Sequence, residues 1–376
     1  MTIADLAVLP GMLAVTWTDG TLTRYPTIWL RDNCLSGLHP QTQERTLDLL
    51  SLDQSPELLA AGRAGSHVEL RYADGHVSTM PLAFLDGHRP GTAAADAAAM
   101  AKTLWRADLG SVGIPRHRAS SILADDAALH AWLVDTAASG LTIVEGLDDR
   151  VSAGTDIAGR IGFLRRTNFG TTFEVVSKPD PNNLAYTSVA LPLHTDLPNQ
   201  EVPPGYQFLH CLANGAQGGG SVFADGFAIA ADLRTEDPKA FRLLSEIAIP
   251  FRFHDEGTDI SVRQPVLTLD EHDDLIEVRF NAHIAGVFDM PSDRMPAYYD
   301  AYRAFMAKTR DPAYHLTLKL EAGQMVVFDN RRVLHGREAF DPSTGHRHLH
   351  GCYVDRGEFA SRLRVLARHR ERVVAA

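Results

Sequence analysis

Residues 325–336 read MVVFDNRRVLHG, and this stretch shows the pattern of short strands that is expected for the larger part of the chain. Apolar runs at 324–328 and 332–334 predict two short strands on either side of a polar interruption. Many short strands in one domain are typical of a β-sandwich or a barrel. Further strands are expected at 141–144, 206–212, 221–223, 249–253, 264–268, 275–281, 314–320 and 348–354.

Helices are expected at the start, in the middle and at the end of the same region. Asp237-Pro238 places a capping residue before a proline at the first helical position, which predicts a helix to about Ile247. The region should therefore be mainly β with helices. The other expected helices are 125–136, 156–164, 296–308 and the stretch from about 358.

The first ninety residues predict a separate, small β-rich domain. Residues 11–25 and 67–80 each predict a hairpin around an Asp-Gly turn. Residues 91–104 are rich in Gly and Ala, which indicates a linker or a short, poorly capped helix. The expected domain bounds are 1–92 and 115–376.

The charge balance of the 376-residue chain argues against binding to nucleic acid. The net charge is -11, and the basic residues are scattered apart from 362–372, which is best explained as a solvated helix face. An anionic membrane surface is disfavoured for the same reason. Apolar residues make up 45% and charged residues 22%, as in an ordinary globular protein. The sequence contains no run of about 18 apolar residues, so no transmembrane span is expected.

The three cysteines, Cys34, Cys211 and Cys352, favour a reducing compartment. An odd, small number argues against a disulfide framework. The first ten residues, MTIADLAVLP, lack a basic segment followed by a long apolar one, so a signal peptide is not expected. We therefore expect a cytoplasmic protein.

The stretch LHTD at 193–196 places His194 and Asp196 two residues apart. In extended backbone such side chains point to the same face, so both can reach one metal ion. One imidazole, one carboxylate and a second His form the facial triad of non-haem iron oxygenases. Another H-x-D, His272–Asp274, lies in a polar run and indicates a solvated turn.

His335 is the favoured third ligand, because an expected strand delivers it. His346, His348 and His350 compete, but they crowd one strand, and the first two flank Arg347. Arg347 lies twelve residues after His335 on the next expected strand, and antiparallel neighbours would bring the two side by side. A guanidinium suits the distal carboxylate of a dicarboxylate, because it grips it with two parallel hydrogen bonds.

The motifs of other enzyme classes fit less well. The sequence holds no G-x-S-x-G and no G-x-x-x-x-G-K-[ST]. Gly218–Gly220 opens no expected helix and indicates a turn rather than a phosphate cradle. Two other classes stay open: a metal-dependent binding or sensor module without turnover, and a hydrolase that holds zinc in the same triad. Neither needs a buried arginine near the metal.

Nine stretches resemble the gamma-butyrobetaine and trimethyllysine dioxygenase branch of the taurine and 2-oxoglutarate dioxygenase superfamily. They occur in the family's order and span nearly the whole chain. The resemblance implies a double-stranded β-helix, or jelly-roll, catalytic domain after a small β-rich N-terminal domain. The stretches are WLRDNC (29–34), RIGFL (160–164), NNLAYT (182–187), LHTDLP (193–198), PPGYQFLHC (203–211), DGF (225–227), FDNRRVLHGR (328–337), RHLHGCYVD (347–355) and SRLRVL (361–366).

The resemblance also implies the chemistry. Family members use iron(II), dioxygen and 2-oxoglutarate to hydroxylate an unactivated C–H bond beside a quaternary ammonium group, whose charge is attracted by aromatic faces. The implied metal ligands are His194, Asp196 and His335, with 2-oxoglutarate on Arg347 and Asn183. The implied trimethylammonium cage consists of Phe169, Phe173, Tyr186 and Tyr353.

The sequence departs from the family in two places. The family's N-terminal domain often binds zinc, but here only Cys34, His39 and His76 are candidates for its four ligands, so a structural zinc is doubtful. Near Asn281, the family's anion-binding region aligns only with a one-residue gap.

The substrate's far end is therefore open. It is the carboxylate of gamma-butyrobetaine, which would give carnitine, or the phosphonate of 2-(trimethylamino)ethylphosphonate. Trimethyllysine is disfavoured, because its free amino acid end needs more recognition. The resemblance also implies a homodimer.

Overall fold

A computed structural model describes residues 2–176 and 187–375 and divides the chain into two compact units, Met1–Asp96 and Ala97–Ala376. Residues 91–104, where the sequence indicates a linker or a short helix, form neither helix nor strand. Within the described ranges, no helix has the length and apolarity that crossing a membrane requires.

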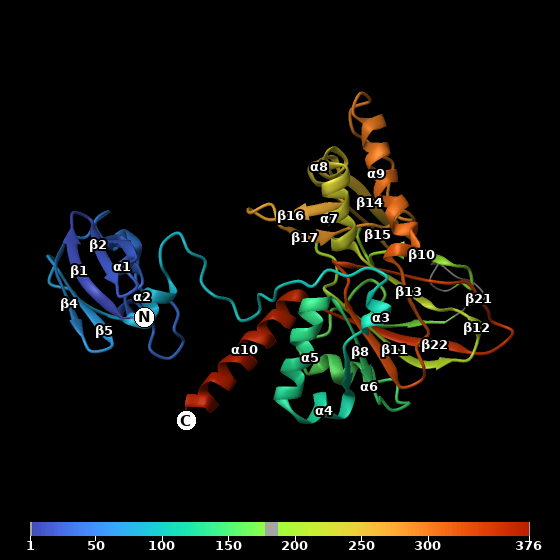
Figure 1. Ribbon diagram of the computed structural model, residues 1–376, viewed down its shortest axis with the longest axis horizontal. Helices are drawn as coiled ribbons and strands as arrows, with labels where there is room; N and C mark the ends of the chain where they lie inside the picture. Colours follow the sequence, from blue (N-terminus) through green and yellow to red (C-terminus); the bar gives the residue numbers. More distant parts are fainter. Residues whose placement is uncertain (1, 177–186, 376) are drawn as a thin grey trace. The chain divides into compact units, whose positions relative to one another are not determined.

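The unit Met1–Asp96 is built from two three-stranded antiparallel sheets and two short helices (Figure 1). Both expected hairpins are confirmed, and each sheet gains a strand that the sequence did not predict. Trp17, Tyr25 and Leu70 are among the buried side chains of its core. The elements are β1 (Ile3–Leu9), β2 (Met12–Trp17), β3 (Leu22–Pro26), α1 (Thr27–Asp32), β4 (Leu58–Ala64), β5 (His67–Tyr72), β6 (Val77–Pro81) and α2 (Leu82–Gly87).

The unit Ala97–Ala376 contains two principal sheets, one of six strands and one of four. The six-stranded sheet has the order β7 (Arg116–Arg118), β8 (Leu141–Glu145), β19 (Gln324–Asp329), β11 (Tyr206–Asn214), β22 (Arg347–Val354) and β9 (Thr172–Val175). The four-stranded sheet has the order β10 (Leu191–His194), β20 (Val333–Arg337), β13 (Ser221–Asp225) and β18 (Leu316–Leu318).

Alternation along the strands produces the layers, because successive side chains of a strand point to opposite faces. In β11, Leu209 belongs to a core cluster that also holds Phe223 of the four-stranded sheet. Its neighbour Phe208 belongs to a separate cluster with Trp132 and Phe359 from helices. The two sheets therefore enclose an inner core and bury their outer faces under helices, as expected for a jelly-roll, and the predicted fold class is confirmed.

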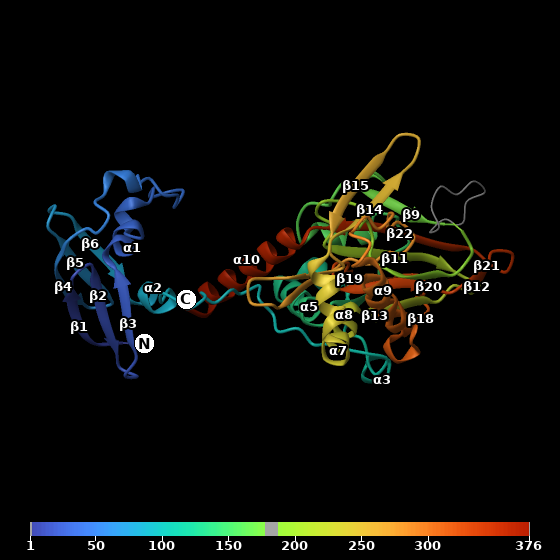
Figure 2. The same ribbon diagram turned by 90° about the horizontal axis from the view of Figure 1, so that it is seen from above.

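Two groups of helices cover these outer faces (Figure 1). The six-stranded sheet is covered by α4 (Ala119–Ala124), α5 (Asp126–Ser139), α6 (Ala153–Gly159) and α10 (Arg356–Ala375). The four-stranded sheet is covered by α7 (Gly226–Glu236), α8 (Pro238–Glu246) and α9 (Met295–Arg310). The other elements are α3 (Leu109–Val112) and two small strand pairs, β12 (Gln217–Gly218) with β21 (Phe340–Asp341) and β16 (Leu267–Leu269) with β17 (Leu275–Val278). A hairpin of β14 (Ile249–His254) and β15 (Asp259–Gln264) extends away from the sheets (Figure 2).

Several expectations about local structure need correction. The helix expected at 156–164 ends at Gly159, and α7 was not predicted. The two expected strands around the Gly-rich turn, β11 and β13, lie in different sheets. The prediction that the strands of His335 and Arg347 are antiparallel neighbours is also wrong. β20 belongs to the four-stranded sheet and β22 to the six-stranded one, since the connection through β21 crosses between the sheets.

Candidate active site

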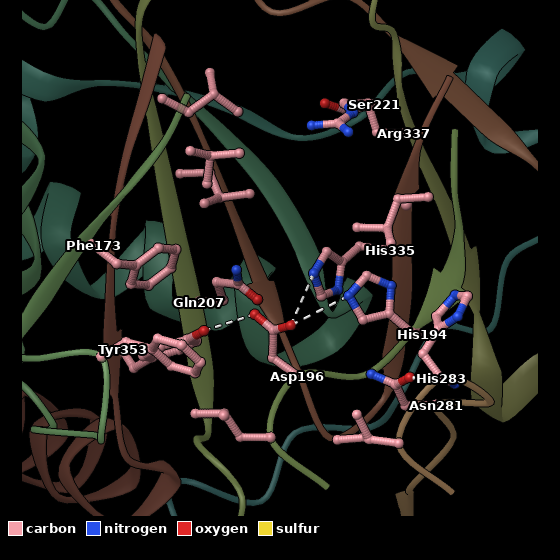
Figure 3. Close-up of a pocket in the computed structure, with 18 of the residues that line it drawn as sticks. Phe173, His194, Asp196, Gln207, Ser221, Asn281, His283, His335, Arg337 and Tyr353 are labelled. Carbon is pink, nitrogen blue, oxygen red and sulfur yellow. Dashed lines mark hydrogen bonds and ion pairs between the residues drawn. The ribbon is translucent and has the colours of Figure 1, made fainter. Parts of the chain in front are cut away.

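A cavity of about 310 Å³ lies between the inner faces of the two sheets. Its walls are apolar and aromatic, with a few polar groups pointing inward (Figure 3). Its volume lies at the small end of the range for ligand pockets, about 300–1,000 Å³, which favours a small substrate. Residues of the sequence-predicted site that line it are Phe169, Phe173, His194, Asp196, Asn281, His335, Arg347 and Tyr353.

Two histidines of the four-stranded sheet face this cavity as direct cross-strand partners. His194 of β10 is paired with His335 of β20, and their ring centroids are 4.4 Å apart. One ligand atom from each histidine and one from Asp196 lie within 4.8 Å of one another. Two imidazoles and one carboxylate in this arrangement match the donor set of a non-haem iron(II) site.

Asp196 reaches the histidines from beyond the end of its strand. β10 ends at His194, and Asp196 lies in the bend that follows, before Leu197 with φ 53°. Its backbone N–H donates to Oδ1 of Asn330 at 2.7 Å, and Nδ2 of Asn330 donates to its carbonyl at 3.0 Å. Arg279 then donates to the carbonyls of Pro198 and Gln200. The segment that carries the carboxylate is thus fixed by hydrogen bonds from two buried side chains.

The protonation of the cluster suits a metal. Nδ1 of His194 lies 2.9 Å from the carbonyl oxygen of Pro192, which can accept a hydrogen bond only from a protonated Nδ1, so Nε2 is the nitrogen that can bind a metal. Burial, with the nearby His194, lowers the pKa of His335 to about 3 despite the opposing effect of Asp196. Burial would raise the pKa of Asp196, but the nearby His335 and His194 hold it below its usual value. A neutral imidazole and an ionised carboxylate are the forms that bind metal.

Arg347 enters the cavity from the opposite, six-stranded sheet. Its side chain is 6% exposed, and its Nε has no hydrogen-bond partner among the described residues. Burial, with the charge of Arg337 nearby, lowers the pKa of Arg347 to about 10. Gly219 makes room for it, since an added Cβ there would lie 3.2 Å from Cδ of Arg347. A buried, unpaired guanidinium is costly unless an anion joins it, so this end of the cavity favours a carboxylate.

Aromatic rings form another wall of the cavity. Phe173 stacks on Tyr353 with centroids 5.0 Å apart, and Phe169 meets Phe253 of β14 edge to face at 5.4 Å. Gly351, the register partner of Phe173, leaves the space that the Phe173 ring occupies, because a Cβ at this position would overlap the ring. The sequence did not indicate Phe253, which comes from a hairpin far along the chain.

The remaining predicted residues divide into three groups. Asn183 and Tyr186 lie outside the described residues. Asn281 lines the cavity, and its Oδ1 accepts a hydrogen bond from the backbone N–H of His283 at 3.0 Å. The competing histidines of β22 are not part of the cavity wall. His350 is the register partner of His210, and His348 lies 3.4 Å from Glu174.

Three polar contributions were missed by the sequence reasoning. The hydroxyl of Tyr353 donates to Oδ2 of Asp196 at 2.6 Å, so this residue contacts the metal cluster as well as the aromatic wall (Figure 3). Asn199 and Oε1 of Gln207 line the cavity, are buried, and have no hydrogen-bond partner among the described residues. Asn199 and the Asn330 that holds Asp196 lie in the stretches LHTDLPN and FDNRR. The spacing of residues in these stretches does not predict where an amide side chain points.

The candidates for a structural zinc site come together only in part. Sγ of Cys34 lies 3.5 Å from Nε2 of His76 and 3.1 Å from Oγ of Ser36. His39 faces its own turn, where Nδ1 accepts a hydrogen bond from the backbone N–H of Thr42. Cys34 and His76 offer two ligands where a structural zinc takes four, so the described residues do not fit such a site.

Comparison with known proteins extends the resemblance. Residues 107–353 match the family described as Taurine catabolism dioxygenase TauD, TfdA family, and residues 8–89 match the family described as Gamma-butyrobetaine hydroxylase-like, N-terminal. A gamma-butyrobetaine dioxygenase of Pseudomonas sp. (strain AK-1) is 42% identical over 97% of this chain and 96% of its own. A mitochondrial trimethyllysine dioxygenase of Gallus gallus is 30% identical over 92% of this chain and 84% of its own.

A solved structure also shares the fold. A variant of the non-heme iron oxygenase OrfP, crystallised with (3S)-hydroxy-L-Arg, aligns with a TM-score of 0.50 at 16% identity. The alignment covers 64% of this chain and 94% of that one. At this identity the likeness concerns the fold alone.

Proposed function

We propose that this chain, which belongs to the Taurine catabolism dioxygenase TauD, TfdA family, hydroxylates a C–H bond of gamma-butyrobetaine. Family membership confirms the predicted enzyme class, an iron(II)- and 2-oxoglutarate-dependent dioxygenase. The choice of substrate follows from the 42% identity to a gamma-butyrobetaine dioxygenase over nearly the full length of both chains. The balanced reaction joins substrate, dioxygen and 2-oxoglutarate to give the hydroxylated product (carnitine), succinate and carbon dioxide.

One observation carries the proposal: a single small cavity contains the metal cluster, an unpaired buried guanidinium and an aromatic wall. His194, Asp196 and His335 would hold the iron, which together with 2-oxoglutarate supplies the oxidising chemistry when bound. Arg347 would bind the distal carboxylate of 2-oxoglutarate from the opposite sheet. The cavity walls exclude bulk water and limit the positions that a bound substrate can take.

The aromatic wall is the part that would select the substrate. Phe169, Phe173 and Tyr353 present ring faces that attract a permanent cation, each worth roughly 0.5–2 kcal/mol when desolvated. A primary ammonium in the same place would leave its N–H donors unpaired, at a cost of about 1–3 kcal/mol. Tyr186 and Asn183 belong to the proposed site through the resemblance. Asn281 is proposed for the carboxylate end of the substrate.

The test is turnover by the full-length, iron-reconstituted protein. Succinate and the hydroxylated product would be measured by mass spectrometry with gamma-butyrobetaine and with 4-aminobutyrate, its unmethylated analogue. 2-(Trimethylamino)ethylphosphonate and trimethyllysine complete the panel. We expect gamma-butyrobetaine to be hydroxylated well and 4-aminobutyrate hardly at all.

Each other outcome has a defined meaning. Equal turnover of gamma-butyrobetaine and 4-aminobutyrate would exclude the trimethylammonium cage, and the aromatic rings would then serve core packing. Preference for the phosphonate would replace the proposed substrate within the same class. Binding of 2-oxoglutarate without succinate formation in the presence of any compound of the panel would favour a sensor module without turnover. Hydrolysis of one of these compounds by the protein loaded with zinc alone would favour a zinc hydrolase.

Two further expectations stay predictions. The homodimer rests on the family resemblance and is tested by light scattering of the eluting protein. The cytoplasmic location rests on the number of cysteines, which are all free in the structure, and is tested by fractionation of cells that express the chain.

A further inference from the structure

The carboxylate of Asp196 uses its two oxygens differently. Oδ1 lies 3.3 Å from Nε2 of His194 and 3.6 Å from Nε2 of His335, so it faces the centre of the cluster. Oδ2 accepts a hydrogen bond from the hydroxyl of Tyr353 at 2.6 Å (Figure 3). This distance is typical of a strong, charge-assisted O–H···O⁻ hydrogen bond. One oxygen is therefore directed to the metal position and the other is held by a phenol.

Tyr353 is well placed to fix this orientation. It is buried, with 4% exposed, and β22 carries it between neighbours on both sides in the six-stranded sheet. Its ring is stacked on Phe173, which removes most of its freedom to turn. The hydroxyl thus has one position relative to the cavity, and Asp196 meets it from the opposite wall.

We propose that Tyr353 is a positioning residue that restricts Asp196 to binding the metal through one oxygen. The proposal rests on the proposed function only in taking the His194–Asp196–His335 cluster as the metal site. Three protein ligands leave three positions of an octahedral ion for co-substrate and dioxygen. A carboxylate bound through both oxygens would occupy one of them. The phenol prevents this by engaging Oδ2.

Three single substitutions separate this role from the aromatic one. Tyr353→Phe removes one oxygen atom and keeps the ring. Phe169→Leu removes a ring of the wall that pairs with Phe253 rather than with Tyr353, so it keeps the hydrogen bond to Asp196. Tyr302→Phe is the matched control, since it deletes a buried hydroxyl in α9 that has no described partner and lies away from the cavity.

The measurement is titration of the metal-free, full-length protein with Co(II), followed by its d–d absorption, without substrate or 2-oxoglutarate. We expect Tyr353→Phe to bind Co(II) about tenfold more weakly, as is usual when a ligand loses its hydrogen-bond partner. Its absorption should also change, because the released Oδ2 can join the metal. Phe169→Leu and Tyr302→Phe should match the wild type within about twofold. Unchanged affinity and spectrum in Tyr353→Phe would overturn the proposal.

A second measurement uses the wild type alone and does not depend on the folding of a variant. Difference infrared spectra with and without Co(II) report the carboxylate stretches of the residue that binds the metal. A wide splitting between the two stretches is expected for one-oxygen binding, and a narrow splitting would overturn the proposal. Neither measurement includes gamma-butyrobetaine. Failure of the proposed function would therefore appear separately, as absent hydroxylation by a wild type that binds Co(II) normally.

Discussion

Among the described residues, two buried cross-strand pairs of histidines can be compared, one on each principal sheet. His194 and His335 are register partners in the four-stranded sheet and face the cavity. His210 and His350 are register partners in the six-stranded sheet, but they face the helix-covered side, where Gly154 of α6 packs on His210. Only the first pair has a carboxylate close enough to complete a set of three ligand atoms among the described residues.

The comparison shows that a pair of neighbouring imidazoles is not by itself a metal site. The inner pair has a third donor on a fixed bend and an open cavity in front of it. The outer pair faces packed side chains, and both ring nitrogens of His210 have no described partner. Two adjacent residues of β22 show the same difference between the faces of a sheet: Arg347 lines the cavity, whereas His348 lies near Glu174.

The sharpest test of the comparison replaces one member of each pair. His335→Ala should abolish turnover and Fe(II) binding, because two protein ligands would remain. His350→Ala should keep both, with a cost confined to stability. Succinate release and metal content of the purified variants measure the difference. Loss of iron in His350→Ala at unchanged folding would contradict the distinction between the two pairs.

The next largest effect concerns the cavity face of β22. Arg347→Ala should raise KM for 2-oxoglutarate by a factor that corresponds to roughly 2–5 kcal/mol of binding free energy, as expected when one partner of a charge-assisted pair is removed. Arg347→Lys keeps the charge and loses the fork, so its effect should be intermediate. KM for 2-oxoglutarate and for gamma-butyrobetaine are measured in parallel. An unchanged KM for 2-oxoglutarate would mean that its distal carboxylate binds elsewhere.

A smaller effect is expected at Gly351, four residues further along β22. Gly351→Ala puts a methyl group where the ring of Phe173 lies, and overpacking of this kind costs about 1–3 kcal/mol. Displacement of the ring should raise KM for gamma-butyrobetaine about tenfold and leave KM for 2-oxoglutarate nearly unchanged. An equal rise in both would show that the whole cavity is distorted.

The smallest expected effect is a pH dependence from the outer pair. Burial lowers the pKa of His210 and of His350; Asp148 opposes this for His210 and Glu174 for His350, while His348 adds to it for both. The unfolded chain therefore binds more protons than the folded one just below the ordinary histidine pKa of about 6.5. Stability should fall as pH drops through this window, and His210→Gln should lessen the fall. Urea unfolding at pH 7.5 and 5.5 gives the loss of unfolding free energy between these two pH values for the wild type and for His210→Gln. An identical loss in both proteins would exclude His210 as a source of the pH dependence.

Sequence reasoning reached the parts of the molecule that local pattern controls. Short apolar runs predicted most strands of the sheets. His194 and Asp196 converge as predicted, but Asp196 does so from a bend after β10 rather than from extended backbone. It failed where the outcome depends on which strands meet. The twelve residues from His335 to Arg347 suit a hairpin as well as a crossing between sheets, and the structure has the crossing.

The other omissions have equally physical causes. Tyr353 was predicted for its ring, and its hydroxyl was not considered because the carboxylate that accepts its hydrogen bond is 157 residues away. α7 was not predicted, since its first residues are apolar on all sides and give no helical period.

The amide of Asn330 has a consequence for how the site keeps its shape. It receives the N–H of Asp196 and donates to the carbonyl of the same residue, which is what a peptide group on an adjacent strand would do. The Asn330 side chain thus replaces one pair of inter-strand backbone hydrogen bonds beyond His194, the last paired residue of β10. Asp196 gains the rigidity of a paired strand while its backbone is already turning. The carboxylate therefore approaches the histidines from a fixed bend that follows the strand, rather than from the strand itself.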